Sequence, residues 1–148
     1  TYTDAHSIPK ISSRRLHANY SHYSRVIVDI YYDHFLAKNW SKYSDTPLDI
    51  FVEDFYDLLE DNYEILPEGA KRMMPYMISD NWLYNYSKME GIGNVLNGMN
   101  RRTKNKSKMN FAIIDLEEHY DSFEKEFTEF FEELITFSKH KYISLLNE

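Results

Sequence analysis

Apolar side chains recur every three or four positions along most of this chain, and that spacing predicts helices. The clearest series lies near the C-terminus, where it predicts one broad apolar stripe on a core-packing helix of about thirty residues. Its members are Phe111, Ile114, Tyr120, Phe123, Phe127, Phe130, Phe131 and Leu134. No segment sustains the alternation of apolar and polar residues that is typical of strands. The pattern therefore predicts an all-α fold.

The same spacing predicts two helices in the first half of the chain. One runs from about Ser21 to Tyr43, and the next extends to about Tyr63. We expect Thr46 to be the N-cap of the second helix and Pro47 its first helical residue. Its buried face is expected to carry Leu48, Phe51, Phe55, Leu58 and Leu59.

Shorter apolar series predict three further helices. The first passes through Met73 and Met77, and Pro75 is expected to kink it or to split it in two. The others are a short helix at residues 82–86 and a helix at residues 92–99 that leads into a basic segment.

The composition agrees with one helical domain. Gly and Pro number only 4 each in 148 residues, which is few for a turn-rich β protein. A chain of this length is expected to form a single domain, residues 1–148, around its own core. The absence of Cys excludes disulfides and thiolate zinc sites.

The charge is acidic overall but unevenly distributed. A formal net charge of −7 disfavours general binding of nucleic acid. Against this background, a run without any acid carries Arg101, Arg102, Lys104, Lys106 and Lys108. Such a run can be a solvated loop, or it can dock an acidic protein through a local positive patch. The sequence leaves both interpretations open.

Membrane and export signals are not recognisable in the sequence. No run approaches the roughly 20 apolar residues of a membrane helix, and no signal peptide is visible. We therefore expect a cytoplasmic protein without a membrane partner. The chain begins Thr1-Tyr2-Thr3-Asp4 rather than with Met, so we interpret it as a piece of a longer protein.

Residues 29–34 place charged groups on a largely apolar predicted helix. At about 100° per residue, Asp29 and Asp33 lie one turn apart on the same stripe, and His22 falls close to that stripe. A carboxylate on a buried helix is costly unless it is paired, hydrogen-bonded or bound to a cation. Two carboxylates at this spacing suit a hard divalent metal ion such as Mg²⁺ or Mn²⁺.

Structural roles explain the same residues. Either aspartate could cap a neighbouring helix or pair with Arg15 or Arg25. His34 could be a hydrogen-bonded core histidine. Near the N-terminus, Asp4 and His6 combine a carboxyl group with an imidazole, and a helix cap explains that pair equally well. We find no Gly-rich phosphate loop, nucleophile elbow or Cys–His arrangement.

Five segments together form a pattern that is more specific than any single motif. They are residues 2–6 (YTDAH), 29–40 (DIYYDHFLAKNW), 80–86 (DNWLYNY), 93–102 (GNVLNGMNRR) and 116–123 (LEEHYDSF). In content and in order, these segments resemble the bacterial acyl carrier protein phosphodiesterase family.

The resemblance implies a compact multi-helix fold related to the HD-type phosphohydrolases. It also implies hydrolysis of the phosphodiester that links 4′-phosphopantetheine to a Ser of holo-acyl carrier protein, with Mn²⁺, or alternatively Mg²⁺, as the metal. The acidic carrier protein is then the expected partner of the basic run. Under this resemblance, the metal ligands are expected to be Asp33, Asp29 and Asp4, and the catalytic residues Asp33, His34, Asp29 and His6.

The chain departs from the family pattern at its start. Family elements that supply further ligands would lie before Thr1, so we expect an incomplete site. Two other functions stay open: a non-catalytic helical module that binds an acidic partner, and hydrolysis of a different phosphodiester or nucleotide. Apolar surface exposed by missing helices would also favour a homo-oligomer.

Overall fold

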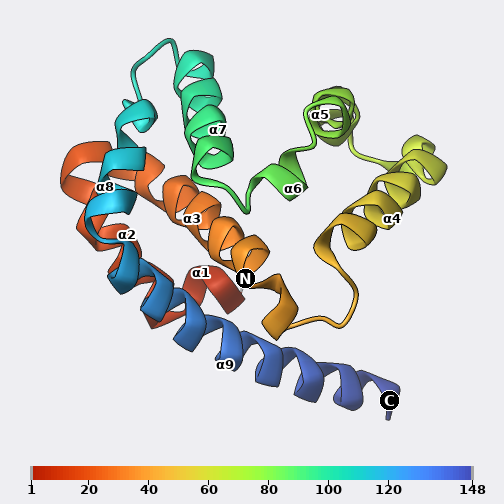
Figure 1. The fold of residues 1–148 in the computed structure, drawn as a ribbon. Coiled ribbons are helices and arrows are strands. Elements are labelled where there is room, and N and C mark those ends of the chain that lie inside the picture. The colour runs from red at the N-terminus through yellow and green to blue at the C-terminus, as the bar shows by residue number, and fades with distance from the viewer. Residues whose placement is uncertain (1, 148) are drawn as a thin grey trace. The chain divides into compact units, whose positions relative to one another are not determined.

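The computed structural model describes residues 2–147, except for the side chain of Asp4, and this part of the chain contains helices and no strand (Figure 1). The α-helices are α1 (Tyr2–Ala5), α2 (Ser7–Tyr20), α3 (Ser24–Lys38), α4 (Leu48–Asp61), α5 (Glu68–Ser79), α6 (Trp82–Asn85), α7 (Met89–Arg102), α8 (Ala112–Glu118) and α9 (Tyr120–Leu146). Short 3₁₀ turns are η1 (Ser21–Tyr23), η2 (Trp40–Lys42), η3 (Tyr63–Ile65) and η4 (Met109–Phe111). The all-α prediction is confirmed.

The chain folds into two compact units. Unit 1 consists of Thr1–Tyr32 and Leu96–Glu148, and unit 2 consists of Asp33–Val95. The boundaries fall inside α3 and inside α7, so each of these helices contributes to both units. A single domain over residues 1–148 stays a prediction, as does a relationship to the HD-type fold. Among the described helices, each is too short or too polar to cross a membrane.

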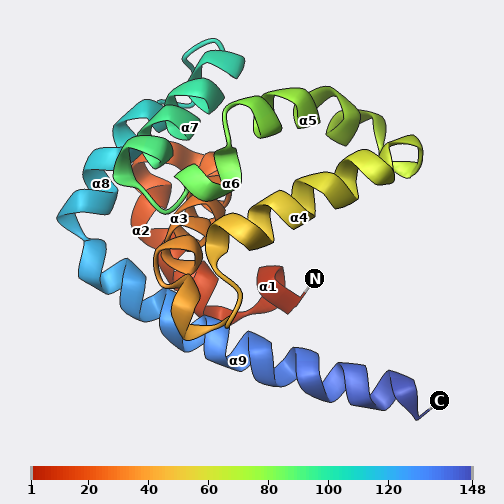
Figure 2. The ribbon, with the colours of Figure 1, turned by 45° about the vertical axis from the view of Figure 1, so that its right-hand side comes forward.

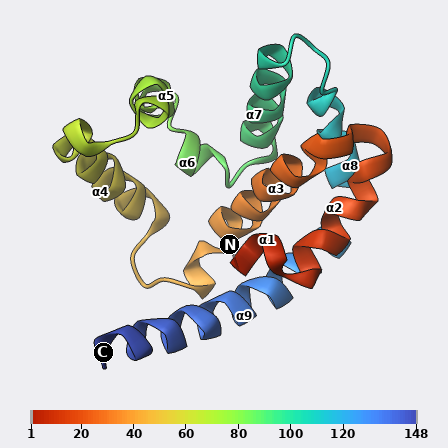
Figure 3. The same cartoon turned by 180° about the vertical axis from the view of Figure 1, so that it is seen from behind.

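The core of unit 1 forms where α9 lies alongside α2 (Figures 1 and 3). Phe123 and Phe127 of α9 are buried and meet the rings of Tyr31 and Tyr32 edge-on, at centroid distances of 5.0 and 5.6 Å. Leu16 of α2 is buried in the same unit. Burial of these large side chains is the main stabilising contribution to the unit.

The C-terminal apolar series forms two helices rather than one. Its first part is η4 and α8, and α9 follows as a separate helix (Figure 2). Between α8 and α9 the chain leaves helical geometry at His119, with φ −119° and ψ 26°. The predicted long helix is therefore confirmed only from Tyr120, over 27 residues. Because the stripe is interrupted, Phe111 and Ile114 are exposed, while Ala112 is buried.

The sequence missed α2 and overextended α3. The buried residues of α2 are only Ser12, Leu16 and Tyr20, and the helix also carries several basic residues. Its apolar pattern is therefore weak. The predicted helix from Ser21 to Tyr43 begins with η1 and ends with η2, so α3 itself is shorter.

Unit 2 contains α4, α5 and α6, and α4 and α5 follow one another through η3 (Figure 2). The expected face of α4 was only partly right: Leu48, Phe55 and Leu59 are half-buried, but Phe51 and Leu58 are exposed. The buried residues of the helix are Val52 and Tyr56. The N-cap is Pro47 rather than Thr46. The remaining helices lie where the pattern predicted them, and α5 continues through Pro75.

Candidate functional site

Asp29 and Asp33 both lie on α3 and both are exposed. The helix is mostly buried, as expected, but the two aspartates lie on its exposed side, because α3 buries its apolar residues instead. Ile30 and Tyr31, between them, are buried. Because the two carboxylates are in contact with water, their burial gives no reason to expect a bound cation. Exposed carboxylates can nevertheless be metal ligands. Their role as metal ligands stays a prediction.

His34 is a core residue of unit 2. Its side chain is 1% exposed, and its Nδ1 lies 2.7 Å from the backbone carbonyl oxygen of Tyr86. The carbonyl can only accept, so Nδ1 carries the proton and donates. This geometry supports the interpretation of a hydrogen-bonded core histidine. A catalytic role for His34 stays a prediction.

The pKa of the Tyr86 phenol is influenced by the nearby Asp33. Burial raises the pKa of Tyr86 to about 12, with a smaller contribution from the negative charge of Asp33 and then from Tyr56. The Asp33 carboxylate is thus close enough to Tyr86 for an electrostatic interaction. Asp33 is therefore an exposed carboxylate whose charge acts on a half-buried phenol.

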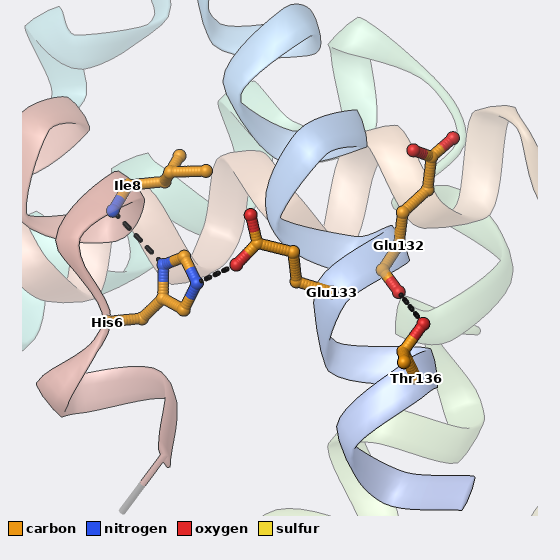
Figure 4. A network of polar contacts seen from close by, with 5 residues as sticks. All are labelled: His6, Ile8, Glu132, Glu133 and Thr136. Atoms are coloured by element: carbon orange, nitrogen blue, oxygen red, sulfur yellow. Dashed lines mark hydrogen bonds and ion pairs between the residues drawn. The ribbon is translucent and has the colours of Figure 1, made fainter.

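His6 links the start of α2 to α9 (Figure 4). Its Nδ1 accepts from the backbone N–H of Ile8 at 3.2 Å and so caps α2. Its Nε2 therefore carries the proton and donates to Glu133 at 2.6 Å. Both ring nitrogens are engaged in holding the fold, and catalysis by His6 stays a prediction. The side chain of Asp4, the third expected metal ligand, lies outside the described part of the chain.

A cavity of about 480 Å³ lies in unit 1 against α2, η1 and the start of α3. Both Asp29 and His22 line it. His22 belongs to η1 rather than α3, so the shared stripe expected from regular helix geometry does not exist, but the two side chains meet at the same cavity. Lys10 and Arg14 also line it and were missed by the sequence analysis. Their spacing of four residues is a usable signal only once α2 is recognised as a helix.

A polar network beneath the surface ties α2, α3 and α9 together. Ser12 donates to Glu126 at 2.5 Å, so the hydroxyl of Tyr32 donates to Ser12 at 2.8 Å. The other carboxylate oxygen of Glu126 pairs with Arg15 at 2.5 Å. Arg15, considered above as a partner for the aspartates of α3, thus has an ion pair with α9.

The basic run forms an ordered loop at the end of α7. The N–H of Asn105 bonds to the carbonyl of Asn100, and that of Lys104 to the carbonyl of Arg101, as in a Schellman cap. Ser107 is buried and donates to the Asn100 side chain at 3.1 Å. The five cations of the run are all exposed: Arg101, Arg102, Lys104, Lys106 and Lys108.

Lys104 and Lys108 have φ of 54° and 55°. Residues other than Gly rarely adopt this left-handed backbone conformation. Gly is the usual residue at the helix-cap position that Lys104 occupies. Lysine thus stands at two positions where the backbone alone favours Gly. The loop keeps its cations at a conformational cost.

The described residues do not by themselves complete a metal site. Among them, no group of three or more His, Asp or Glu side chains is close enough to hold an ion. The type of donor at Asp29 and Asp33 fits a hard divalent cation, but the number of donors does not.

Comparison with known proteins gives a consistent result. The model of the family described as acyl carrier protein phosphodiesterase matches residues 1–134. A putative acyl carrier protein phosphodiesterase of Shigella flexneri is 35% identical over 120 residues, which cover 78% of this chain and 82% of that protein. No solved structure matches the chain significantly.

Longer relatives show the same similarity. The acyl carrier protein phosphodiesterase of Escherichia coli O139:H28 is 35% identical over 78% of this chain, which spans only 61% of that protein. The acyl carrier protein phosphodiesterase of Photorhabdus laumondii is 30% identical over 141 residues, covering 94% of this chain and 71% of that protein.

Proposed function

Because this chain belongs to the acyl carrier protein phosphodiesterase family, we propose that it hydrolyses the phosphodiester between 4′-phosphopantetheine and the Ser of holo-acyl carrier protein. The products are the apo-carrier protein and the free prosthetic group. The match of the family model to residues 1–134 is the observation that carries this proposal. A cytoplasmic location and a homo-oligomeric state, both expected from the sequence, remain part of the proposal.

The proposal includes a divalent metal ion, Mn²⁺ or alternatively Mg²⁺. Asp29 and Asp33 would contribute carboxylate oxygens to it, since both are exposed on one helix and of the donor type that such ions prefer. When bound, such an ion supplies charge neutralisation and an acidified water. Asp4 is proposed as a further ligand.

The chain's own residues can hold the aspartates in place. His34 fixes the helix beside Asp33 through its hydrogen bond to the Tyr86 carbonyl. His6 fixes the start of α2 against α9 through its hydrogen bonds with Ile8 and Glu133. We propose both as positioning residues of the reaction, because their ring nitrogens hold the protein scaffold.

The ordered basic loop supports recognition of an acidic protein. Its exposed cations, Arg101, Arg102, Lys104, Lys106 and Lys108, would attract the acidic carrier and speed the encounter. The left-handed Lys104 and Lys108 support this role, because such conformations persist where function selects them.

Mass spectrometry of the carrier protein tests the reaction. The protein is incubated with holo-carrier, with and without Mn²⁺, and loss of the phosphopantetheine mass is expected only with the metal. Asp33→Asn or Asp29→Asn should slow this loss about a hundredfold or more. Asp57→Asn, an exposed aspartate of α4, is the matched control and should have no effect. Full metal-dependent turnover by Asp33→Asn would remove that residue from the site.

The same assay separates the second candidate function, a non-catalytic module that binds an acidic partner. The ordered basic loop favours this candidate independently of the aspartates. Binding of the carrier without any loss of mass would support it and contradict hydrolysis.

Charge reversal tests the docking surface. Replacing Lys104, Lys106 and Lys108 with Glu should raise KM for the carrier about tenfold at low salt, with kcat unchanged. The effect should shrink as salt is added. Reversal of the exposed Lys139 and Lys141 on α9 is the control. An unchanged KM at low salt would exclude docking through this loop.

A further inference from the structure

The cavity of unit 1 carries an excess of positive charge. Its described lining includes three cations, two histidines and a single acid, namely Lys10, Arg14, Arg25, His17, His22 and Asp29. Within the described part of the chain, none of the three cations forms an ion pair. On a chain with a net charge of −7, such a cluster attracts an anion.

Hydroxyl groups complete the donors of the cavity. Ser13, Ser21 and Ser24 line it. The hydroxyls of Ser13 and Ser24 are hydrogen-bonded at 2.8 Å, which joins α2 to α3 at the cavity wall. Guanidinium, ammonium and hydroxyl groups are the side chains that donate to phosphate oxygens.

Ser21 adds an independent observation. Its φ is 50° and its ψ is −128°, a backbone conformation that residues other than Gly rarely adopt. Its N–H donates to the His17 carbonyl, which holds the turn between α2 and η1. Through this turn, His17 and His22 reach the same cavity from two elements. Backbone strain of this kind is concentrated at ligand-binding and catalytic sites.

We infer that this cavity binds the phosphate group of a phosphoester, with Lys10, Arg14 and Arg25 as its main donors. The inference rests on the proposed function, since it identifies the phosphate as that of the phosphopantetheine group. A volume of about 480 Å³ suits a small-molecule ligand. Asp29 lines the same cavity, so the bound phosphate and this candidate metal ligand belong to one site.

Calorimetric titration of the chain tests the inference without turnover. The ligands are 4′-phosphopantetheine, pantetheine without the phosphate, and inorganic phosphate. Phosphopantetheine should bind about tenfold or more tightly than pantetheine, and inorganic phosphate should compete with it. Equal affinity for the two pantetheines, or failure of phosphate to compete, would overturn the inference.

Arginine variants locate the site. Arg14→Gln and Arg25→Gln should each weaken phosphopantetheine binding about tenfold or more, and Arg72→Gln, an exposed arginine of α5, should not. The two arginines lie on different helices and are exposed, so a folding defect in one variant leaves the other as a test. Thermal unfolding checks both. Wild-type affinity in both variants would overturn the inference.

Separate measurement of turnover distinguishes this inference from the proposed function. If the protein removes phosphopantetheine from the carrier but its arginine variants bind phosphopantetheine normally, the proposed function stands and the cavity is not the phosphate site. If the protein binds phosphopantetheine through Arg14 and Arg25 but leaves the holo-carrier protein intact, the phosphate site stands and the proposed hydrolysis is contradicted.

Discussion

His34 donates a hydrogen bond of 2.7 Å from Nδ1 to the backbone carbonyl oxygen of Tyr86, and the two residues are 52 positions apart. The bond is made by a side chain that is 1% exposed, in the residue directly after Asp33. It therefore ties the segment before α7 to the helix that carries both candidate metal ligands. The histidine next to a predicted catalytic aspartate supports the scaffold.

Substitution of His34 tests this role. His34→Ala should lower the free energy of unfolding by about 2–4 kcal/mol, because it leaves a cavity and an unpaired carbonyl. His34→Asn should recover part of that loss, since its amide can donate to the same carbonyl. Urea unfolding measures both. A catalytic role would require His34→Asn to lose carrier hydrolysis although it folds.

Two glycines of α7 provide a matched pair. A Cβ at Gly91 would overlap the backbone carbonyl of Asn85, whereas one at Gly93 would meet nothing within 4 Å. Gly91→Ala should therefore destabilise the protein by about 2 kcal/mol or more. Gly93→Ala should stabilise it by about 0.5–1 kcal/mol, because Ala loses less backbone entropy in a helix. Equal melting temperatures for the two variants would contradict the close approach of α6 and α7 at Gly91.

Glu126 accepts from Ser12 and pairs with Arg15, so its removal should affect α2 as well as α9. Glu126→Ala should cost about 1–3 kcal/mol, since it leaves the buried hydroxyl of Ser12 without its acceptor. Glu129→Ala, an exposed glutamate one turn away, should change stability by less than about 0.5 kcal/mol. Hydrogen exchange of α2 amides should increase only in the first variant.

Alkaline pH should destabilise the protein through its buried phenols. Burial, the largest cause, raises the pKa of Tyr32 to about 12, and the negative charges of Glu126 and Asp29 raise it further, while the positive charge of Arg15 lowers it. An unfolded tyrosine titrates near pH 10. Between about pH 10 and 12 the unfolded chain loses this proton and the folded chain keeps it. The free energy of unfolding should then fall by about 1.4 kcal/mol per pH unit for Tyr32.

Urea unfolding at pH 8, 10 and 11 measures this slope. Tyr32→Phe should make the slope shallower, because the substituted ring has no proton to lose. The stability that depends on the protonated phenol is complete below pH 10 and is lost as the pH rises toward 12, which is the sign expected for a raised pKa. An identical slope in the variant would contradict the assignment to Tyr32.

Local patterns in the sequence were sufficient for much of the fold. The helices at residues 68–79 and 89–102 and the long helix ending at Leu146 follow from apolar spacing, because a helix closes its hydrogen bonds within four residues. The family segments and the one-turn spacing of Asp29 and Asp33 are equally local. By contrast, α2 has too few apolar residues to stand out, and it forms because α9 lies alongside it.

The sequence by itself thus determined the helical class, the family and the order of the candidate site residues. The tertiary structure decided which sides are buried: it left Asp29 and Asp33 exposed, buried His34, and joined His6 to Glu133 across 127 positions. It also formed the cavity that Asp29 shares with Lys10, Arg14 and Arg25. Helical periodicity is set by neighbours in the chain, whereas burial and ion pairing depend on segments that meet only after folding.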